Sequence, residues 1–183
     1  MKTGFDARPG MGMDPDCPVL FLNQGEFYIS GERPVAVRTI LGSCVTVTMH
    51  CPVTGIGAIT HSLLPYPLPG TQVGPGHQGR FVVSSVTLVF DRLMALGVRR
   101  SRLEVKVFGG GRMLLRPSGT PLDNEIHIGR RNAETALKVI GELGLKVTAT
   151  DLGGNWGRRL IFFPHRGDVW IKKILRSGGG KKA

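Results

Sequence analysis

LGSCVTVTMHCPVTGIGAITHSLLP, residues 41–65, contains two apolar segments separated by a short turn. From residue 45 to residue 49, valine and methionine alternate with threonine, which is typical of a strand with one buried face. The segment CPVTG predicts a turn, and IGAITHSLL predicts a strand that returns beside the first. The stretch therefore predicts a β-hairpin with Cys44 on one strand and His61 on the other.

The register of this hairpin decides whether Cys44 and His61 are neighbours. A six-residue connection, residues 50–55, places them directly opposite each other on one face, with Cβ atoms about 5 Å apart. A five-residue connection, residues 51–55, places them on opposite faces unless a β-bulge restores the pairing. The sequence leaves both registers open.

A cysteine beside a histidine is the arrangement of a nucleophile and its base. Imidazole stabilises a neighbouring thiolate, and Cys44 begins a strand, so His61 rather than a helix dipole would activate it. Gly42 and Ser43 precede the cysteine and permit an unusual backbone turn there. Backbone N–H groups in that turn would bind the oxyanion of an acyl-transfer reaction.

Two other interpretations of these residues stay open. A cysteine among apolar residues is commonly a small buried hydrophobic side chain. A zinc site would use Cys44, His50, Cys51 and His61, although their spacing matches no compact pair of cysteines. We predict no metal and no cofactor, and we assign His50 and Cys51 to the turn.

The composition is that of one globular domain with a strong basic charge. The 183 residues include 24 basic and 13 acidic ones, for a net charge of +11, which favours nucleic acid, an anionic membrane surface or an acidic protein as partner. The two tryptophans and two tyrosines offer little surface for base stacking, so charge alone favours nucleic acid. Three cysteines argue against a disulfide framework, and neither a signal peptide nor a membrane-spanning run is visible, so we expect a cytoplasmic protein with reduced thiols.

The remaining sequence predicts further strands and two helices. We expect strands within 18–30 (around a turn at Gln24-Gly25) and over 35–40, 103–107 and 145–152, and a final hairpin made of RLIFF and VWIKKI. Helical spacing of apolar residues predicts helices over 82–96 and 131–143, and Gly97 and Gly144 end them. GPGHQG, residues 74–79, follows a proline-rich segment rather than a strand, so we assign it to a flexible loop despite its nucleotide-loop spacing. We also expect loops at 116–124 and at His77, His127 and His165.

These elements predict an α+β fold of layered antiparallel or mixed sheets with two main helices. The chain has no internal repeat and no linker that would divide it. We expect a disordered leader over 1–18, one domain over 19–175 and a disordered basic tail over 176–183.

Five blocks of sequence together resemble the CheD family of chemoreceptor glutamine deamidases. They are LGSCVTV, GIGAITHSLLP, KVFGGGRML, IGRRNAE and DLGGNWGRR, in the family's order, over about residues 20–175. The resemblance implies hydrolysis of chemoreceptor glutamine side chains to glutamate, with Cys44 and His61 in catalysis and Thr39 as the third residue. It also implies a fold similar to the catalytic domain of cytotoxic necrotizing factor, a cysteine hydrolase.

The chain departs from the family pattern at two places. Thr60 stands where members often have asparagine, and the segment Arg80–Val83 lacks the usual aspartate. A non-catalytic module that binds a receptor or a CheC-like phosphatase is therefore a second hypothesis, and a nucleic-acid-binding protein is a third. The deamidase hypothesis expects the cytoplasmic helices of chemoreceptors as substrate, with neither nucleic-acid binding nor membrane insertion.

Overall fold

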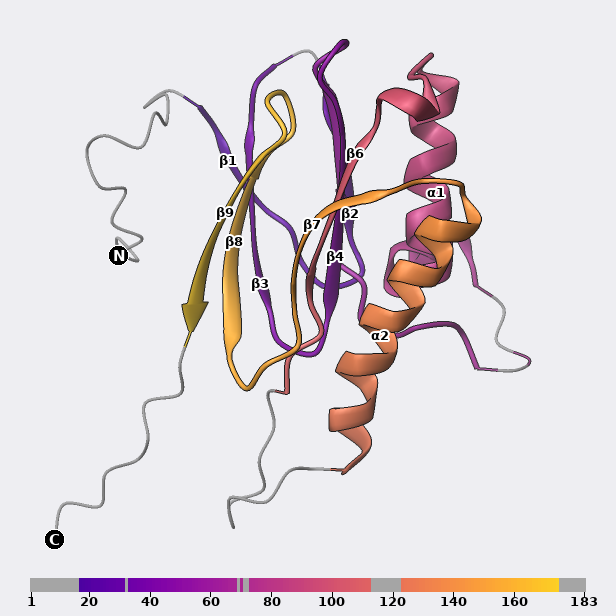
Figure 1. The fold of residues 1–183 in the computed structure, drawn as a ribbon, viewed down its shortest axis with the longest axis vertical. Helices are drawn as coiled ribbons and strands as arrows, with labels where there is room; N and C mark the ends of the chain where they lie inside the picture. Colours follow the sequence, from indigo (N-terminus) through magenta and orange to yellow (C-terminus); the bar gives the residue numbers. More distant parts are fainter. Residues whose placement is uncertain (1–16, 32, 69, 71–72, 113–122, 175–183) are drawn as a thin grey trace, which may run out of the picture.

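The computed structural model describes residues 17–31, 33–68, 70, 73–112 and 123–174. The predicted leader, the predicted basic tail and most of the expected loop at 116–124 lie outside these residues. Two β-sheets stack face to face, and two helices cover the outer face of one of them (Figure 1). Within the described residues, neither helix is long and apolar enough to cross a membrane.

The first sheet, sheet A, has the strand order β1-β3-β8-β9, and the second, sheet B, has the order β2-β5-β4-β6-β7. Sheet A comprises β1 (Val19–Phe21), β3 (Ala36–Leu41), β8 (Gly157–Phe163) and β9 (Asp168–Ile174). Sheet B comprises β2 (Phe27–Ile29), β4 (Val45–Cys51), β5 (Ile56–Thr60), β6 (Glu104–Gly109) and β7 (Val147–Leu152). Each sheet holds one parallel pair, β1 with β3 and β6 with β7, and is otherwise antiparallel. The predicted α+β fold with mixed sheets and two helices is confirmed.

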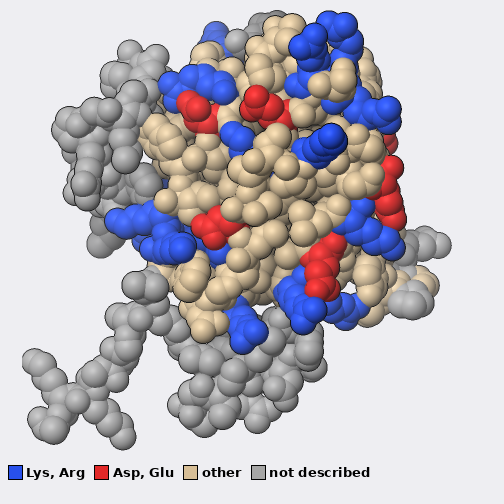
Figure 2. Space-filling view, viewed as in Figure 1, with Lys and Arg blue, Asp and Glu red and all other residues tan. Residues whose placement is uncertain are grey.

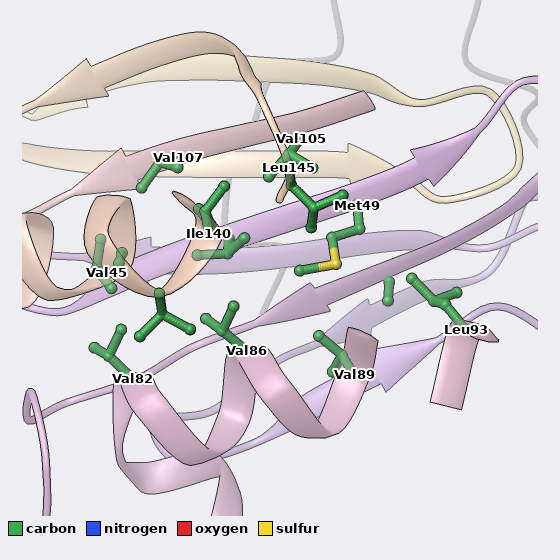
Figure 3. Packing of buried hydrophobic residues seen from close by; sticks show 14 of the residues in the cluster. Val45, Met49, Val82, Val86, Val89, Leu93, Val105, Val107, Ile140 and Leu145 are labelled. Atoms are coloured by element: carbon green, nitrogen blue, oxygen red, sulfur yellow. The ribbon is translucent and has the colours of Figure 1, made fainter. Parts of the chain in front are cut away.

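The helices α1 (Val82–Ala95) and α2 (Asp123–Glu142) pack on sheet B. Along α1, four fully buried residues recur at helical spacing and face the sheet (Figure 3): Val82, Val86, Val89 and Leu93. Burial of such a side chain is worth about 2 kcal/mol, which outweighs the weak helix propensity of valine. Packing on the sheet therefore makes this β-branched segment a helix.

A second core lies between the two sheets. Alternate residues of β4 point into it, while Val45, Val47 and Met49 point toward the helices. Apolar side chains from both sheets fill it: Leu22, Val37, Leu41, Cys44, Ile59, Phe108, Leu160 and Phe162. Sheet B is therefore covered on both faces, which explains why β4 is buried along its whole length.

Several predicted elements differ in extent from the observed ones. Helix α1 ends as predicted near Gly97, whose φ of 80° suits a C-terminal glycine. Helix α2 begins at Asp123 instead of residue 131, so the placement of His127 in a loop was wrong. Residues 75–80, which include His77, form a short 3₁₀ helix, η1, so their assignment to a flexible loop was wrong. Gly79 in this helix packs against the carbonyl of Gly25.

The turn between β8 and β9 contacts sheet B and holds one end of the two sheets together. The ring of His50 is buried, and its Nδ1 donates a hydrogen bond to the carbonyl of Pro164 at 2.8 Å. A Cβ on Gly57 would lie 2.4 Å from the same carbonyl oxygen, so only glycine allows this approach. The carbonyl of Pro164 therefore contacts both His50 of β4 and Gly57 of β5.

We predict that Gly57→Ala destabilises the protein by about 1–3 kcal/mol, because the added methyl separates β5 from the turn. Gly31→Ala is the matched control, since a Cβ there meets no atom within 4 Å. Urea unfolding should show a lower midpoint for Gly57→Ala alone, with an unchanged m-value. Equal midpoints for the two variants would contradict this close contact.

Candidate active site

The β4–β5 hairpin has a register that neither predicted connection describes. Cys51 pairs with Ile56, so the connection is the four residues 52–55. The predicted five- and six-residue connections were both wrong. His50 and Cys51 are the last two residues of β4, so their assignment to the turn was also wrong.

Cys44 and His61 are diagonal neighbours across this hairpin. Val45 and Ser62 exchange two backbone hydrogen bonds, of 3.0 and 2.9 Å, and continue the register of the hairpin. Cys44 precedes one member of this pair and His61 precedes the other. Direct opposition was therefore wrong, but both side chains share one face, where diagonal neighbours have Cβ atoms about 7 Å apart.

The shared face points into the core between the sheets. Cys44 is 5% exposed and His61 is 2% exposed. Cys44 belongs to the same apolar cluster as Leu22, Phe108 and Leu160. A thiol and an imidazole therefore lie together in surroundings that contain little water.

Thr39 reaches His61 from the opposite sheet. It lies in β3 of sheet A, is fully buried, and its Oγ1 lies 2.8 Å from Nδ1 of His61. The hydroxyl of Thr39 donates to the backbone carbonyl of Leu22 at 2.8 Å, so its oxygen can only accept from the ring. Nδ1 also lies 3.3 Å from the Leu22 carbonyl, which is an acceptor as well. Nδ1 therefore carries the proton.

The other ring nitrogen is consequently the basic one. Nε2 of His61 is buried and has no hydrogen-bond partner among the described residues. In a neutral ring with its proton on Nδ1, Nε2 keeps a lone pair. The arrangement can accept a proton at Nε2 while Thr39 and Leu22 hold the ring in one orientation.

Burial shifts the two titratable groups in opposite directions. Loss of solvation raises the pKa of the Cys44 thiol to about 11, although its own backbone N–H favours the thiolate. Loss of solvation lowers the pKa of His61, against the carbonyl of Leu22 and the charge of Glu26, which both favour the protonated ring. Both shifts favour a neutral thiol beside a neutral imidazole.

Gly42 and Ser43 form a bend before Cys44, as the sequence predicted. Glycines at the end of β6 hold this bend: Gly111 N–H donates to the carbonyl of Gly42, and Gly110 N–H donates to that of Cys44, both at 2.8 Å. Gly109 has a φ of 110°, and a Cβ there would lie 2.2 Å from the oxygen of Cys44. The glycine run thus allows the close backbone approach that positions Cys44.

The four side chains considered for zinc do not converge. Cys51 belongs to the core on the helix side of sheet B, whereas Cys44 faces the other sheet. His50 donates to the carbonyl of Pro164. Within the described part of the chain, no three histidine, cysteine or acidic side chains form a group able to hold a metal.

Sequence reasoning missed two buried polar residues near the site. Asn132 of α2 donates hydrogen bonds to the carbonyls of Ser43 and Leu63. Arg158 of β8 is fully buried and pairs with Asp151 at 2.7 Å. Both lie in blocks that carried the family resemblance, IGRRNAE and DLGGNWGRR, but nothing in the sequence shows where their side chains bind.

Comparison with known proteins places the chain in a family. The model of the family described as CheD chemotactic sensory transduction matches residues 63–173. The chain belongs to the CheD family. It is 37% identical to a probable chemoreceptor glutamine deamidase CheD 2 of Geobacter sulfurreducens, over 89% of this chain and 94% of that protein.

Two more relatives carry the same description. The chain is 40% identical to a probable chemoreceptor glutamine deamidase CheD of Maridesulfovibrio salexigens, over 85% of this chain and 91% of that protein. A Bordetella parapertussis protein of the same description is 35% identical, over 86% of this chain and 70% of its own length. The predicted resemblance to the CheD family is confirmed.

The two departures from the CheD family pattern lie next to His61 in the sequence and in the first turn of α1. Thr60 is buried, and its Oγ1 accepts a 3.2 Å hydrogen bond from the N–H of Val47. Val83 occupies the first turn of α1, which contains no acidic residue. The side-chain hydrogen bonds of Thr39 and His61 involve neither Thr60 nor Val83.

We predict that Cys44 reacts with iodoacetamide at a rate that rises with pH beyond 9.0, the ordinary pKa of a cysteine, toward about 11. Only the thiolate reacts, and burial delays its formation. Alkylation of Cys44 can be followed by peptide mass spectrometry, with Cys17 as an internal comparison because it lies outside this core. If the alkylation rate of Cys44 stopped rising by pH 8, the account of a neutral Cys44 thiol beside a neutral His61 ring would be contradicted.

Proposed function

We propose that this chain is a chemoreceptor glutamine deamidase that uses Cys44 as nucleophile and His61 as base. The observation that supports it most is the 2.8 Å contact from Thr39 to Nδ1 of His61, which leaves Nε2 as the basic nitrogen on the face of Cys44. A buried thiol, an oriented imidazole and a third residue that orients it are the parts of a cysteine hydrolase. The names of the relatives supply the substrate class, the glutamine side chain of a chemoreceptor.

In the first step, the sulfur of Cys44 bonds to the carboxamide carbon of the glutamine. The thiol proton passes to Nε2 of His61 as this bond forms, because the resting pair is neutral. The carbonyl π electrons move onto oxygen and give a tetrahedral oxyanion. Backbone N–H groups at the bend of Gly42 and Ser43 stabilise that oxyanion.

In the second step, the oxyanion collapses and the C–N bond breaks. Protonated His61 gives its proton to the departing nitrogen, which leaves as ammonia, and a thioester to Cys44 remains. His61 then accepts a proton from water, the water oxygen attacks the thioester, and the sulfur departs and regains the proton. The products are glutamate on the receptor and the original thiol.

Thr39 orients His61 during both steps. As the ring gains a proton on Nε2, its Nδ1–H keeps its acceptors, the oxygens of Thr39 and Leu22. These two dipoles stabilise the charged ring without any movement of the protein.

The net charge of +11 suits an acidic protein surface as partner. Figure 2 shows lysine and arginine spread over the visible face, with acidic residues in small groups beside them. Such a surface would attract the acidic cytoplasmic helices of a chemoreceptor. Four further expectations stay predictions: a CheC-like phosphatase as second partner, a cytoplasmic location, a single domain over 19–175 and a fold similar to that of cytotoxic necrotizing factor.

We predict that the protein converts glutamine to glutamate in a purified chemoreceptor cytoplasmic fragment and that Cys44→Ala abolishes this reaction, because the thioester cannot form. Peptide mass spectrometry would detect the small mass gain that accompanies conversion of each amide to an acid. Cys51→Ala is the matched control, because this buried cysteine lies on the other face of β4. Deamidation at the parental rate by Cys44→Ala would overturn the mechanism, and binding of the fragment without conversion would favour the non-catalytic module.

A further inference from the structure

One side chain of α2 contacts both chain segments that carry the proposed catalytic pair. Asn132 is fully buried, and its Nδ2 donates to the carbonyl of Ser43 at 3.0 Å and to the carbonyl of Leu63 at 2.7 Å. Ser43 immediately precedes Cys44, and Leu63 follows His61 by two residues. A single amide group thus ties the nucleophile segment to the base segment.

The chemistry of the contact requires an amide. Both partners of Nδ2 are carbonyl oxygens, so the side chain must present two N–H donors at this end. The other end, Oδ1, is buried without a hydrogen-bond partner among the described residues. An unsatisfied buried oxygen costs about 1–3 kcal/mol of stability, which a side chain without that oxygen would avoid. The asparagine is present in spite of this cost, which points to a role for its two N–H donors.

The hydrogen bonds also fix the direction of backbone N–H groups around the sulfur. In a trans peptide unit, the C=O and the N–H point in opposite directions. The carbonyls of Gly42, Ser43 and Cys44 are bound in turn by Gly111 N–H, by Asn132 and by Gly110 N–H. The N–H groups of Ser43 and Cys44 therefore point away from α2 and from the glycine run.

One of these N–H groups acts on the proposed nucleophile. The backbone N–H of Cys44 belongs to the peptide unit whose carbonyl Asn132 binds, and it lowers the pKa of the Cys44 thiol. An N–H that favours negative charge on the sulfur also lies where the oxyanion of the tetrahedral intermediate would form. The direction of this peptide unit depends on a side-chain donor, whereas the units on either side depend on backbone donors.

A close helix approach brings Asn132 to this position. Gly129 precedes it by three residues on the same face of α2. A Cβ on Gly129 would lie 2.7 Å from the carbonyl oxygen of Gly111 and 2.8 Å from that of Gly110. Glycine therefore allows α2 to touch the glycine run, and the short asparagine side chain then reaches Ser43.

We propose that Asn132 is a positioning residue of the oxyanion site: it orients the Ser43–Cys44 peptide so that the Cys44 N–H stabilises the tetrahedral intermediate. The proposal rests on the proposed deamidase function. It predicts a larger loss in acyl transfer than in alkylation of the thiol. Alkylation by iodoacetamide passes through no oxyanion, so the two reactions separate a positioning role from a general loss of structure.

The experiment compares Asn132→Ala with the parent protein in two assays. Deamidation of a receptor fragment should show kcat lower by about tenfold or more with KM changed less than threefold, because an oxyanion donor is misdirected. The alkylation rate of Cys44 at the same pH should fall by a factor at least three times smaller than the fall in kcat, because the Cys44 N–H also favours the thiolate but alkylation forms no oxyanion. Ser85→Ala is the matched control: Ser85 is fully buried in α1 and hydrogen-bonds the side chain of Ser62 at 2.6 Å, without contact to the bend. Its kcat should stay within threefold of the parent value.

An unchanged kcat in Asn132→Ala, or equal losses of kcat and alkylation rate, would overturn the proposal. If circular dichroism shows that Asn132→Ala does not fold, Asn132→Leu replaces it, because this side chain has a similar branched shape, lacks the two N–H donors and adds no charge beside Cys44. The same two assays and the same criteria then apply. A parent protein without deamidase activity would overturn the proposed function, whereas an active parent with an equally active Asn132 variant would overturn this inference alone.

Discussion

The hydrogen bond between Thr39 and His61 is the interaction on which the site depends. It joins β3 of sheet A to the end of β5 in sheet B across an otherwise apolar core. A buried imidazole without partners would cost about 1–3 kcal/mol, so the contact both stabilises the stacked sheets and fixes the ring. The carbonyl of Leu22 determines the direction of the bond, because it accepts the hydroxyl proton of Thr39. The Thr39 oxygen is then left to accept from Nδ1–H of His61. A backbone carbonyl thus decides which ring nitrogen is basic.

The burial that strengthens the hydrogen bond between Thr39 and His61 also keeps the Cys44 thiol and the His61 ring uncharged before reaction. The thiol pKa is raised and the imidazole pKa is lowered for the same reason, the loss of water around both groups. An ion pair would be costly in such surroundings, and a proton transfer during bond formation avoids it. Donors aimed at the developing charge then matter more than donors at the surface, because little water competes with them.

Much of the fold follows from short-range patterns in the sequence. Alternation from residue 45 to residue 49 predicts β4 and its two faces, and the spacing of Val82, Val86 and Val89 predicts α1 despite their weak helix propensity. The register of the hairpin does not follow, because connections of four and six residues place the same side chains on the same face. A five-residue connection would separate them, so the sequence left open whether Cys44 and His61 share a face, and it did not predict their diagonal placement.

Contacts between layers are the part that sequence patterns miss. Neither the separation of β1 and β2 into different sheets nor the reach of Asn132 from α2 leaves a periodic signal. Thr39 was assigned through the family resemblance alone, and the structure brings its hydroxyl to the imidazole. The glycines of the run Gly109–Gly111 are visible in the sequence, but the atoms that they allow to approach belong to distant segments.

The protonation state of His61 tests the central claim most directly. Long-range ¹H–¹⁵N correlation spectra of the protein labelled at histidine nitrogens distinguish a neutral ring protonated on Nδ1 from one protonated on Nε2. We predict the Nδ1–H form for His61 at neutral pH, persisting below pH 6.5, because its pKa is lowered from that value. In Thr39→Val, which keeps the shape of the side chain and loses the hydroxyl, we expect a larger fraction of the Nε2–H form, because only the more distant carbonyl of Leu22 remains to accept from Nδ1. A neutral ring protonated on Nε2 in the parent protein would contradict the account, because His61 would then have no basic nitrogen toward Cys44.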